Sequence, residues 1–177
     1  MKRLGLLRHA KSDLDDAALR DFDRGLNERG RRGAALIGRH IADTAIAWDL
    51  TLASPAERVK RTIEASALPL APRFDERVYL ADAATLTELL RRVEGDPANV
   101  LVVGHNPGLH ELLFRLVDPE RESAIFDRAA EKFPTASFAL LELTIDRWGD
   151  LAPGCGTLVD FARPRDFDPD LGPDTIG

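Results

Sequence analysis

The alternation of short apolar runs with amphipathic segments is the feature that most constrains how this chain can fold. Residues 100–103 are apolar at every position, which predicts a strand buried on both faces of a parallel sheet. Residues 4–7 and 49–53 predict two further strands, and stretches with apolar residues every three or four positions separate the runs. Strands that alternate with helices predict an α/β fold of three layers, α/β/α, in which helices cover both faces of a mostly parallel sheet.

Local signals predict where the helices begin. Asn27 is expected to be the N-cap of the first helix, and Asp82 that of the third. Ser54-Pro55-Ala56-Glu57 predicts an N-cap, a proline in the first turn and a capping-box glutamate for the second helix. A fourth helix is expected after Asn106-Pro107. The apolar faces of the first, third and fourth helices are predicted to be Ala34, Ile37 and Ile41; Leu86, Leu89, Leu90 and Val93; and Leu109, Leu112, Leu113 and Leu116.

The remaining segments carry weaker patterns. Residues 77–80 are expected to form a short strand or an extended piece, and residues 136–143 and 156–161 a hairpin that would make the sheet mixed. Residues 118–132 carry charges of both signs without a clear period, so they are expected to be a helix with a loop, or an insert over the sheet edge, with a solvated face. Residues 1–162 are predicted to form one domain, and residues 163–177 an irregular or frayed tail.

Composition limits the classes of function. With 177 residues the chain suits one domain, and its net charge of -6 argues against general nucleic-acid binding. Cys155 is the single cysteine, so no internal disulfide can form and a reducing compartment is expected. No apolar run approaches the ~20 residues of a membrane span. We therefore expect a cytoplasmic protein without a membrane segment.

Three predicted strand-to-helix junctions carry groups that suit chemistry on an anion. Arg8 and His9 follow the first strand, Ser54 and Arg58 follow the second, and His105 follows residues 100–103. Ligands of open α/β sheets bind beyond the carboxyl ends of the strands, so these groups meet if their strands are neighbours. Arginine forks match phosphate oxygens with two bonds, and helix N-termini favour negative charge. The sequence therefore predicts a phosphate site.

Other phosphatase chemistries and a metal site find less support. A cysteine phosphatase needs an arginine six residues after its cysteine, but Phe161 follows Cys155 at that spacing. Residues 21–23, Asp-Phe-Asp, do not follow a strong apolar strand, and the chain has no Gly-x-x-x-x-Gly-Lys-Ser/Thr loop. His110 falls on a different helix face from His105, so no metal site is expected there. His40 is expected at the surface, and Lys132 and Thr135 are expected to be structural.

Four segments in order resemble the histidine phosphatase superfamily: residues 7–12 (LRHAKS), 21–30 (DFDRGLNERG), 54–58 (SPAER) and 103–108 (VGHNPG). Within that superfamily they look most like the small SixA-type phosphohistidine phosphatases, to which residues 132–135 (KFPT) are also similar. The resemblance implies a phosphoglycerate mutase-like fold and a metal-independent phosphatase without a cofactor. Its implied partner is a phosphohistidine-bearing protein, for example a histidine phosphotransfer domain.

The resemblance also implies roles for individual residues. His9 is similar to the nucleophile that takes the phosphoryl group, Arg8 and Arg58 to the arginines that grip its oxygens, and His105 to the second histidine of that pocket. Ser54 and Asn27 are implied to bind the substrate with them, to support these groups or to cap helices.

One departure bears on the substrate. Relatives that act on alcohol phosphates use a carboxylate to protonate the leaving oxygen, often just after a Leu-Tyr pair, but Leu80 follows Val78-Tyr79 here. The P–N bond of phosphohistidine needs less help, so phosphohistidine is the expected substrate. Two alternatives remain: a small-molecule phosphomonoesterase with Glu76 or Asp82 as the acid, and a non-catalytic phosphate- or phosphoprotein-binding module.

Overall fold

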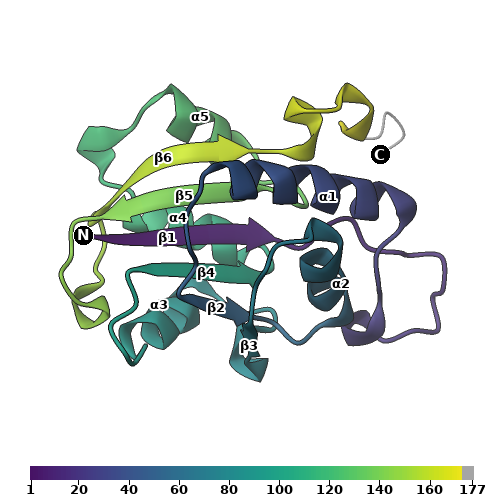
Figure 1. The fold of residues 1–177 in the computed structure, drawn as a ribbon, viewed down its shortest axis with the longest axis horizontal. Helices are drawn as coiled ribbons and strands as arrows, with labels where there is room; N and C mark the ends of the chain where they lie inside the picture. Colours follow the sequence, from purple (N-terminus) through teal and green to yellow (C-terminus); the bar gives the residue numbers. More distant parts are fainter. Residues whose placement is uncertain (173–177) are drawn as a thin grey trace.

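One six-stranded sheet forms the centre of the computed structural model, which describes residues 1–172 (Figure 1). The strand order is β3-β2-β4-β1-β5-β6. β3, β2, β4 and β1 are parallel, whereas β5 runs antiparallel to both β1 and β6. The predicted mixed, mostly parallel sheet is therefore confirmed. The strands are β1 (Lys2–Arg8), β2 (Leu50–Ala53), β3 (Pro72–Phe74), β4 (Asn99–Gly104), β5 (Phe138–Leu143) and β6 (Gly156–Ala162).

Helices cover both faces of the sheet, which confirms the three-layer prediction (Figure 1). On β4, Val100 and Val102 pack into the core on the side of α3, α4 and α5. Leu101 and Val103 pack on the opposite side, with α1 and α2. Both faces of β4 are thus buried, as its continuous apolar run predicts. The helices are α1 (Glu28–Asp43), α2 (Glu57–Ser66), α3 (Ala83–Arg91), α4 (Gly108–Leu116) and α5 (Ala124–Glu131).

Two of the three predicted caps are confirmed. The Asn27 side chain accepts a hydrogen bond from the Gly30 amide at 2.8 Å, and the Asp82 side chain accepts one from the Thr85 amide at 2.8 Å. The cap predicted for α2 is wrong, because that helix begins at Glu57 and Ala56 occupies the N-cap position. Ser54 lies before the helix and has a different role, described below.

The expected strand at residues 77–80 is wrong. The Asp75 side chain accepts a hydrogen bond from the Arg77 amide, which caps the short 3-10 helix Glu76–Val78 instead. The edge strand is β3, and its first residue is Pro72. Three residues are too few to show an alternating pattern, and proline is tolerated at a strand's beginning or at a sheet edge.

The C-terminal third contains both expected and unexpected structure. The hairpin of β5 and β6 is confirmed. Residues 118–132 form the 3-10 helix Pro119–Arg121 and α5, whose Phe126 and Ala129 are buried, so only part of this segment is solvated.

The segment after β6 is irregular but not frayed. Its 3-10 helices Pro164–Asp166 and Pro169–Leu171 lie against α1. Arg32 of α1 pairs with Asp168 at 2.6 Å, and Arg29 donates to the Gly172 carbonyl at 2.9 Å. Residues 163–172 are therefore irregular, as expected, but anchored rather than frayed, while residues 173–177 lie outside the described part of the chain. Within residues 1–172, no helix is both long and apolar enough to traverse a bilayer.

His40 also differs from the expectation of a surface position. Its side chain is 25% exposed, and its Nε2 lies 2.6 Å from the Asp160 carboxylate of β6. This contact ties α1 to the sheet.

Candidate active site

The three predicted junctions meet at the carboxyl edge of the sheet because β4 lies between β2 and β1. The His9 amide donates to the Gly104 carbonyl at 3.0 Å, which joins the end of β1 to the end of β4. The Ser54 amide donates to the Val103 carbonyl at 3.0 Å, which joins the end of β2 to β4. The sheet therefore brings His9, Ser54 and His105 side by side.

His9 is held as a neutral ring with one free nitrogen. Its Nδ1 lies 2.7 Å from the Ala10 carbonyl oxygen, which can only accept, so Nδ1 carries the hydrogen and Nε2 keeps a lone pair. Burial lowers the pKa of His9 to about 3, and the charges of Arg8 and Arg58 add to this effect against the opposing hydrogen bond to Ala10. A buried neutral imidazole with an available Nε2 is suited to nucleophilic attack.

A buried threonine of α2 fixes the residue that orients His9. The Thr62 hydroxyl accepts a hydrogen bond from the Ala10 amide at 2.8 Å and donates to the Arg58 carbonyl at 2.7 Å. Ala10 is thereby held between Thr62 on one side and the His9 ring on the other. Thr62 was not singled out from the sequence, because its contact joins positions 52 residues apart.

Arg58 and His105 contact each other directly. The Arg58 guanidinium Nη2 lies 3.3 Å from His105 Nδ1, and since arginine can only donate, Nδ1 accepts. His105 Nε2 then carries the hydrogen and donates to the Ser54 hydroxyl at 2.8 Å. Burial and the Arg58 charge lower the pKa of His105 to about 4. The rings of His9 and His105 lie with their centroids 5.3 Å apart.

Arg8 adds a second guanidinium to this edge of the sheet. Its Nη1 donates to the Phe133 carbonyl at 3.1 Å, while its buried Nε has no hydrogen-bond partner. Burial lowers the pKa of Arg8, and the neighbouring charge of Arg58 adds to the lowering. Two cations that repel each other at the edge of a buried site are stabilised by an anion between them.

Asp21 and Tyr79 also belong to the site, although the sequence did not assign them to it. The Asp21 carboxylate accepts hydrogen bonds from Arg58 Nη2 at 3.0 Å and from the Tyr79 hydroxyl at 2.5 Å. The Tyr79 ring meets His105 edge-on, with centroids 5.4 Å apart. Burial alone would raise the pKa of the Asp21 carboxyl, but the hydrogen bonds from Tyr79 and Arg58 outweigh it and hold that pKa below its usual value.

The signals for these two residues were partial. Asp21 lies within one of the four motif segments but at the start of the three-residue 3-10 helix Asp21–Asp23, and Tyr79 directly precedes Leu80. The residues around Asp21 and Tyr79 show no helical or strand period of apolar residues, so the sequence does not indicate where these two side chains point.

The other candidate residues lie outside the four-residue cluster, which consists of Arg8, His9, Arg58 and His105. Asn27 caps α1 and also donates to the Ser12 carbonyl at 3.4 Å, and its role with substrate stays a prediction. Glu76 and Asp82 are exposed, and the Asp82 carboxylate is engaged as the cap of α3. Lys132 and Thr135 line a cavity that shares Arg8 with the cluster. His110 lies apart, with its Nε2 at 2.8 Å from the Ala129 carbonyl.

Comparisons with known proteins agree with this architecture. The sequence profile of the Histidine phosphatase superfamily (branch 1) matches residues 4–80. The Uncharacterized protein Rv1276c of Mycobacterium tuberculosis is 37% identical over 160 residues, which cover 90% of this chain and 100% of that protein.

Two solved structures share the fold. A candidate phosphohistidine phosphatase SixA from Nakamurella multipartitia superposes with a TM-score of 0.81 at 29% identity, over 92% of this chain and 96% of that chain. A second, from Agrobacterium tumefaciens, gives a TM-score of 0.72 at 30% identity, over 92% and 98% of the two chains. The phosphoglycerate mutase-like fold expected from the sequence is therefore confirmed.

Proposed function

This chain belongs to the histidine phosphatase superfamily, and from that premise we propose that it hydrolyses the P–N bond of phosphohistidine on a protein. The proposed reaction proceeds through a covalent phosphoryl group on His9 and needs no metal or cofactor. Its substrate is a phosphohistidine-bearing protein of the histidine phosphotransfer kind.

In the first step, Nε2 of His9 attacks the phosphorus atom and the P–N bond to the substrate imidazole breaks. The hydrogen bond from Nδ1 to the Ala10 carbonyl supports this assignment, because it leaves Nε2 with the lone pair. The departing imidazole nitrogen takes a proton from solvent. In the second step, water attacks the phosphorus atom, the bond to His9 breaks, and inorganic phosphate leaves.

The two arginines would stabilise the negative charge of the phosphoryl group during its transfer. Phosphoryl transfer depends on in-line positioning and on charge stabilisation at the three equatorial oxygens. Arg8 and Arg58 supply two guanidinium groups, and Arg58 already binds an oxygen anion, the Asp21 carboxylate. The phosphoryl oxygens would take the place of that carboxylate or share the guanidinium with it. His105 orients the Arg58 guanidinium, because its Nδ1 accepts from Arg58 while its Nε2 donates to Ser54.

The observation that carries the substrate assignment is the state of the nearest carboxylate. Asp21 contacts the cluster, but Arg58 and Tyr79 hold its pKa low, so it is ionised and has no proton to give to a leaving alkoxide. Glu76 and Asp82 are both exposed. A site without a protonated carboxylic acid favours a leaving group that departs with little acid assistance, and phosphohistidine offers one.

A leaving-group series tests the proposal. Wild-type protein is assayed for phosphate release from a phosphohistidine peptide, p-nitrophenyl phosphate and glycerol phosphate. General acid assistance is typically worth about 10²–10⁴-fold, so glycerol phosphate should react at least about a hundredfold more slowly than the other two. Glu76→Gln and Asp82→Asn should leave phosphohistidine hydrolysis unchanged, and Asp82→Asn keeps a side chain that can cap α3.

Two results would contradict the proposal. Efficient glycerol phosphate hydrolysis that Glu76→Gln or Asp82→Asn abolishes would establish the small-molecule phosphomonoesterase instead. Binding of phosphohistidine without phosphate release, together with no acid-labile phosphoryl label on His9, would establish the binding module.

A further inference from the structure

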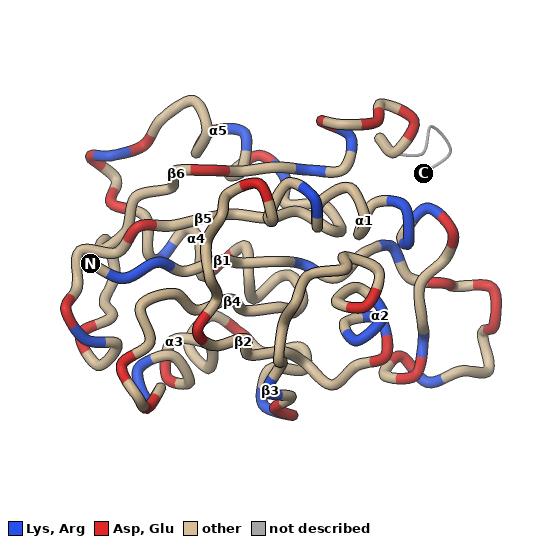
Figure 2. Tube along the Cα trace, viewed as in Figure 1, with Lys and Arg blue, Asp and Glu red and all other residues tan. Residues whose placement is uncertain are grey.

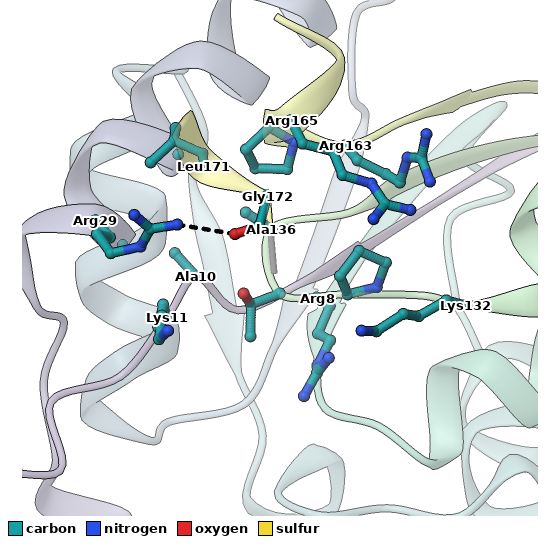
Figure 3. A pocket seen from close by; sticks show the side chains of 15 residues that line it. Arg8, Ala10, Lys11, Arg29, Lys132, Ala136, Arg163, Arg165, Leu171 and Gly172 are labelled. Carbon is teal, nitrogen blue, oxygen red and sulfur yellow. Dashed lines mark hydrogen bonds between the residues drawn. The ribbon is translucent and has the colours of Figure 1, made fainter. Parts of the chain in front are cut away.

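A cavity of about 250 Å³ lies beside the four-residue cluster and shares Arg8 with it (Figure 3). Its wall comes from the end of β1, the first turns of α1, the turn before β5 and the two 3-10 helices after β6. His9, Arg58 and His105 do not line it, so it is a separate space that adjoins the phosphoryl site through one arginine. The segment after β6, which was expected to be frayed, therefore builds part of this cavity.

Six cationic side chains line the cavity, and none of its lining residues within the described part of the chain is acidic. Figure 3 shows them arranged around the hollow from several directions. The whole chain has a net charge of -6, and Figure 2 shows acidic residues spread over loops at both ends of the sheet. The cavity is therefore a local concentration of positive charge in an acidic protein. The six cations are Arg8, Lys11, Arg29, Lys132, Arg163 and Arg165.

Part of this charge is already neutralised or held by the fold. Arg163 pairs with Asp166 at 2.8 Å, and Arg29 donates to the Gly172 carbonyl. These contacts fix two of the guanidinium groups in place at the wall. Arg8 retains a buried Nε without a hydrogen-bond partner. Cations held this close together favour an anion at their centre, more strongly in a partly enclosed space than in open water.

The position of the cavity identifies what kind of anion it would receive. Arg8 contributes to the phosphoryl site and to the cavity, so a molecule with its phosphoryl group on the cluster can place a second group here. The two attachments of one molecule reinforce each other through effective concentration. A volume of about 250 Å³ is below the roughly 300–1,000 Å³ of pockets that enclose whole ligands, so it suits one side chain.

We propose that this cavity binds a second anionic group of the substrate, namely the carboxylate of an aspartate or glutamate that lies near the phosphohistidine in the substrate protein. The assignment rests on the proposed function. It makes Lys132 and Arg165 specificity-determining residues, because both line the cavity and come from different segments.

The test compares two phosphohistidine peptides of equal length, one with acidic and one with alanine residues beside the phosphohistidine. Lys132→Gln/Arg165→Gln removes two cavity charges. Arg92→Gln/Arg147→Gln is the matched control, because it removes two exposed charges that do not line the cavity. The measured quantity is the ratio of kcat/KM for the acidic peptide to kcat/KM for the alanine peptide.

Exposed or half-buried ion pairs contribute modestly, so two of them together should give the wild type a preference of about tenfold for the acidic peptide. Lys132→Gln/Arg165→Gln should reduce the ratio to about one, mainly through KM, and the control should keep it near ten. Equal ratios in the wild type and the cavity variant would overturn the inference while leaving phosphohistidine hydrolysis intact.

A binding measurement separates this inference from the proposed function. Calorimetry with His9→Asn reports peptide binding without turnover. If His9→Asn prefers the acidic peptide and the wild type hydrolyses neither peptide, the cavity assignment stands and the proposed function fails. If the cavity variant loses turnover of 3-phosphoglycerate but shows no change with either peptide, the second anion belongs to a small molecule and the assignment to a protein side chain is wrong.

Discussion

Acid should destabilise this protein through the two buried histidines of the site. The pKa of His9 is lowered to about 3 and that of His105 to about 4, whereas an unfolded histidine titrates near 6.5. A folded pKa below the unfolded one means that the unfolded state binds the proton first. The contribution to stability is therefore complete above pH ~6.5 and is lost as the pH falls toward the folded pKa.

The size of the loss follows from the shift. Each histidine that titrates only in the unfolded state changes the free energy of unfolding by about 1.36 kcal/mol per pH unit. Because the unfolded rings are half protonated at pH 6.5, the loss between pH 6.5 and 5.0 amounts to about 1.6 kcal/mol for each ring, or about 3 kcal/mol for the pair. His9 is 8% exposed and His105 is 3% exposed, so solvent reduces the effect little.

Urea unfolding of the wild type, His9→Asn and His105→Gln at several pH values between 5.0 and 8.5 measures the effect. Asparagine at position 9 retains a donor for the Ala10 carbonyl and cannot titrate. Each variant should lose about 1.6 kcal/mol less than the wild type between pH 6.5 and 5.0. Above pH 7.5 the three curves should run parallel, which serves as the internal control. Parallel curves below pH 6.5 would refute the reasoning, because the histidines would then keep their ordinary pKa values in the folded protein.

Three further outcomes follow from the contacts of the site. Arg58→Ala should cost about 2–4 kcal/mol of transition-state stabilisation, measured as kcat/KM for phosphohistidine. Arg58→Lys should recover little of this loss, because lysine lacks the forked pair of donors of a guanidinium. Near wild-type kinetics of Arg58→Ala would limit the role of Arg58 to holding Asp21. Thr62→Val should raise the activation free energy that corresponds to kcat by about 1 kcal/mol and leave KM unchanged. Thr62→Ser should restore kcat, whereas equal losses of kcat in both variants would indicate that Thr62 acts through packing alone. Gly38→Ala should reduce the free energy of unfolding, measured with urea, by about 1–3 kcal/mol, because the added Cβ would lie 2.1 Å from the Ser66 carbonyl oxygen. Gly25→Ala is the control and should differ little from wild type, because an added Cβ there meets nothing within 4 Å. Equal effects of the two substitutions would contradict this account.

The predictable parts of this structure are those governed by local or repeating signals. β4 and β1 were found because strands buried on both faces are apolar at successive positions. The caps of α1 and α3 were found because Asn27 and Asp82 bond to amides three residues away. The meeting of His9 with His105 followed from topology, since parallel strands end at the same edge of their sheet.

The parts that were missed depend on contacts between distant positions. Ser54 was predicted at the site, but its side chain was also assigned to the cap of α2, whereas its hydroxyl lies against His105, 51 residues away. Asp21 reaches Arg58 across 37 residues and Tyr79 across 58. The tail after β6 has few apolar residues, and its attachment to α1 through Asp168 is electrostatic, so no hydrophobic pattern indicated it.

The geometry of the site therefore depends on how α2 packs against its neighbours. Arg58 and Thr62 lie four residues apart on α2, so they occupy one face, and through them the helix both contacts His105 and fixes Ala10. The absence of a Cβ at Gly38 allows α1 to approach the end of α2 at Ser66, and its absence at Gly30 allows α1 to approach the Lys11 backbone just after His9. A change that separates α1 from α2 would shift Arg58 and the tether of His9 together. The two glycines are thus a condition for the arrangement of Arg58 and Ala10 in the site.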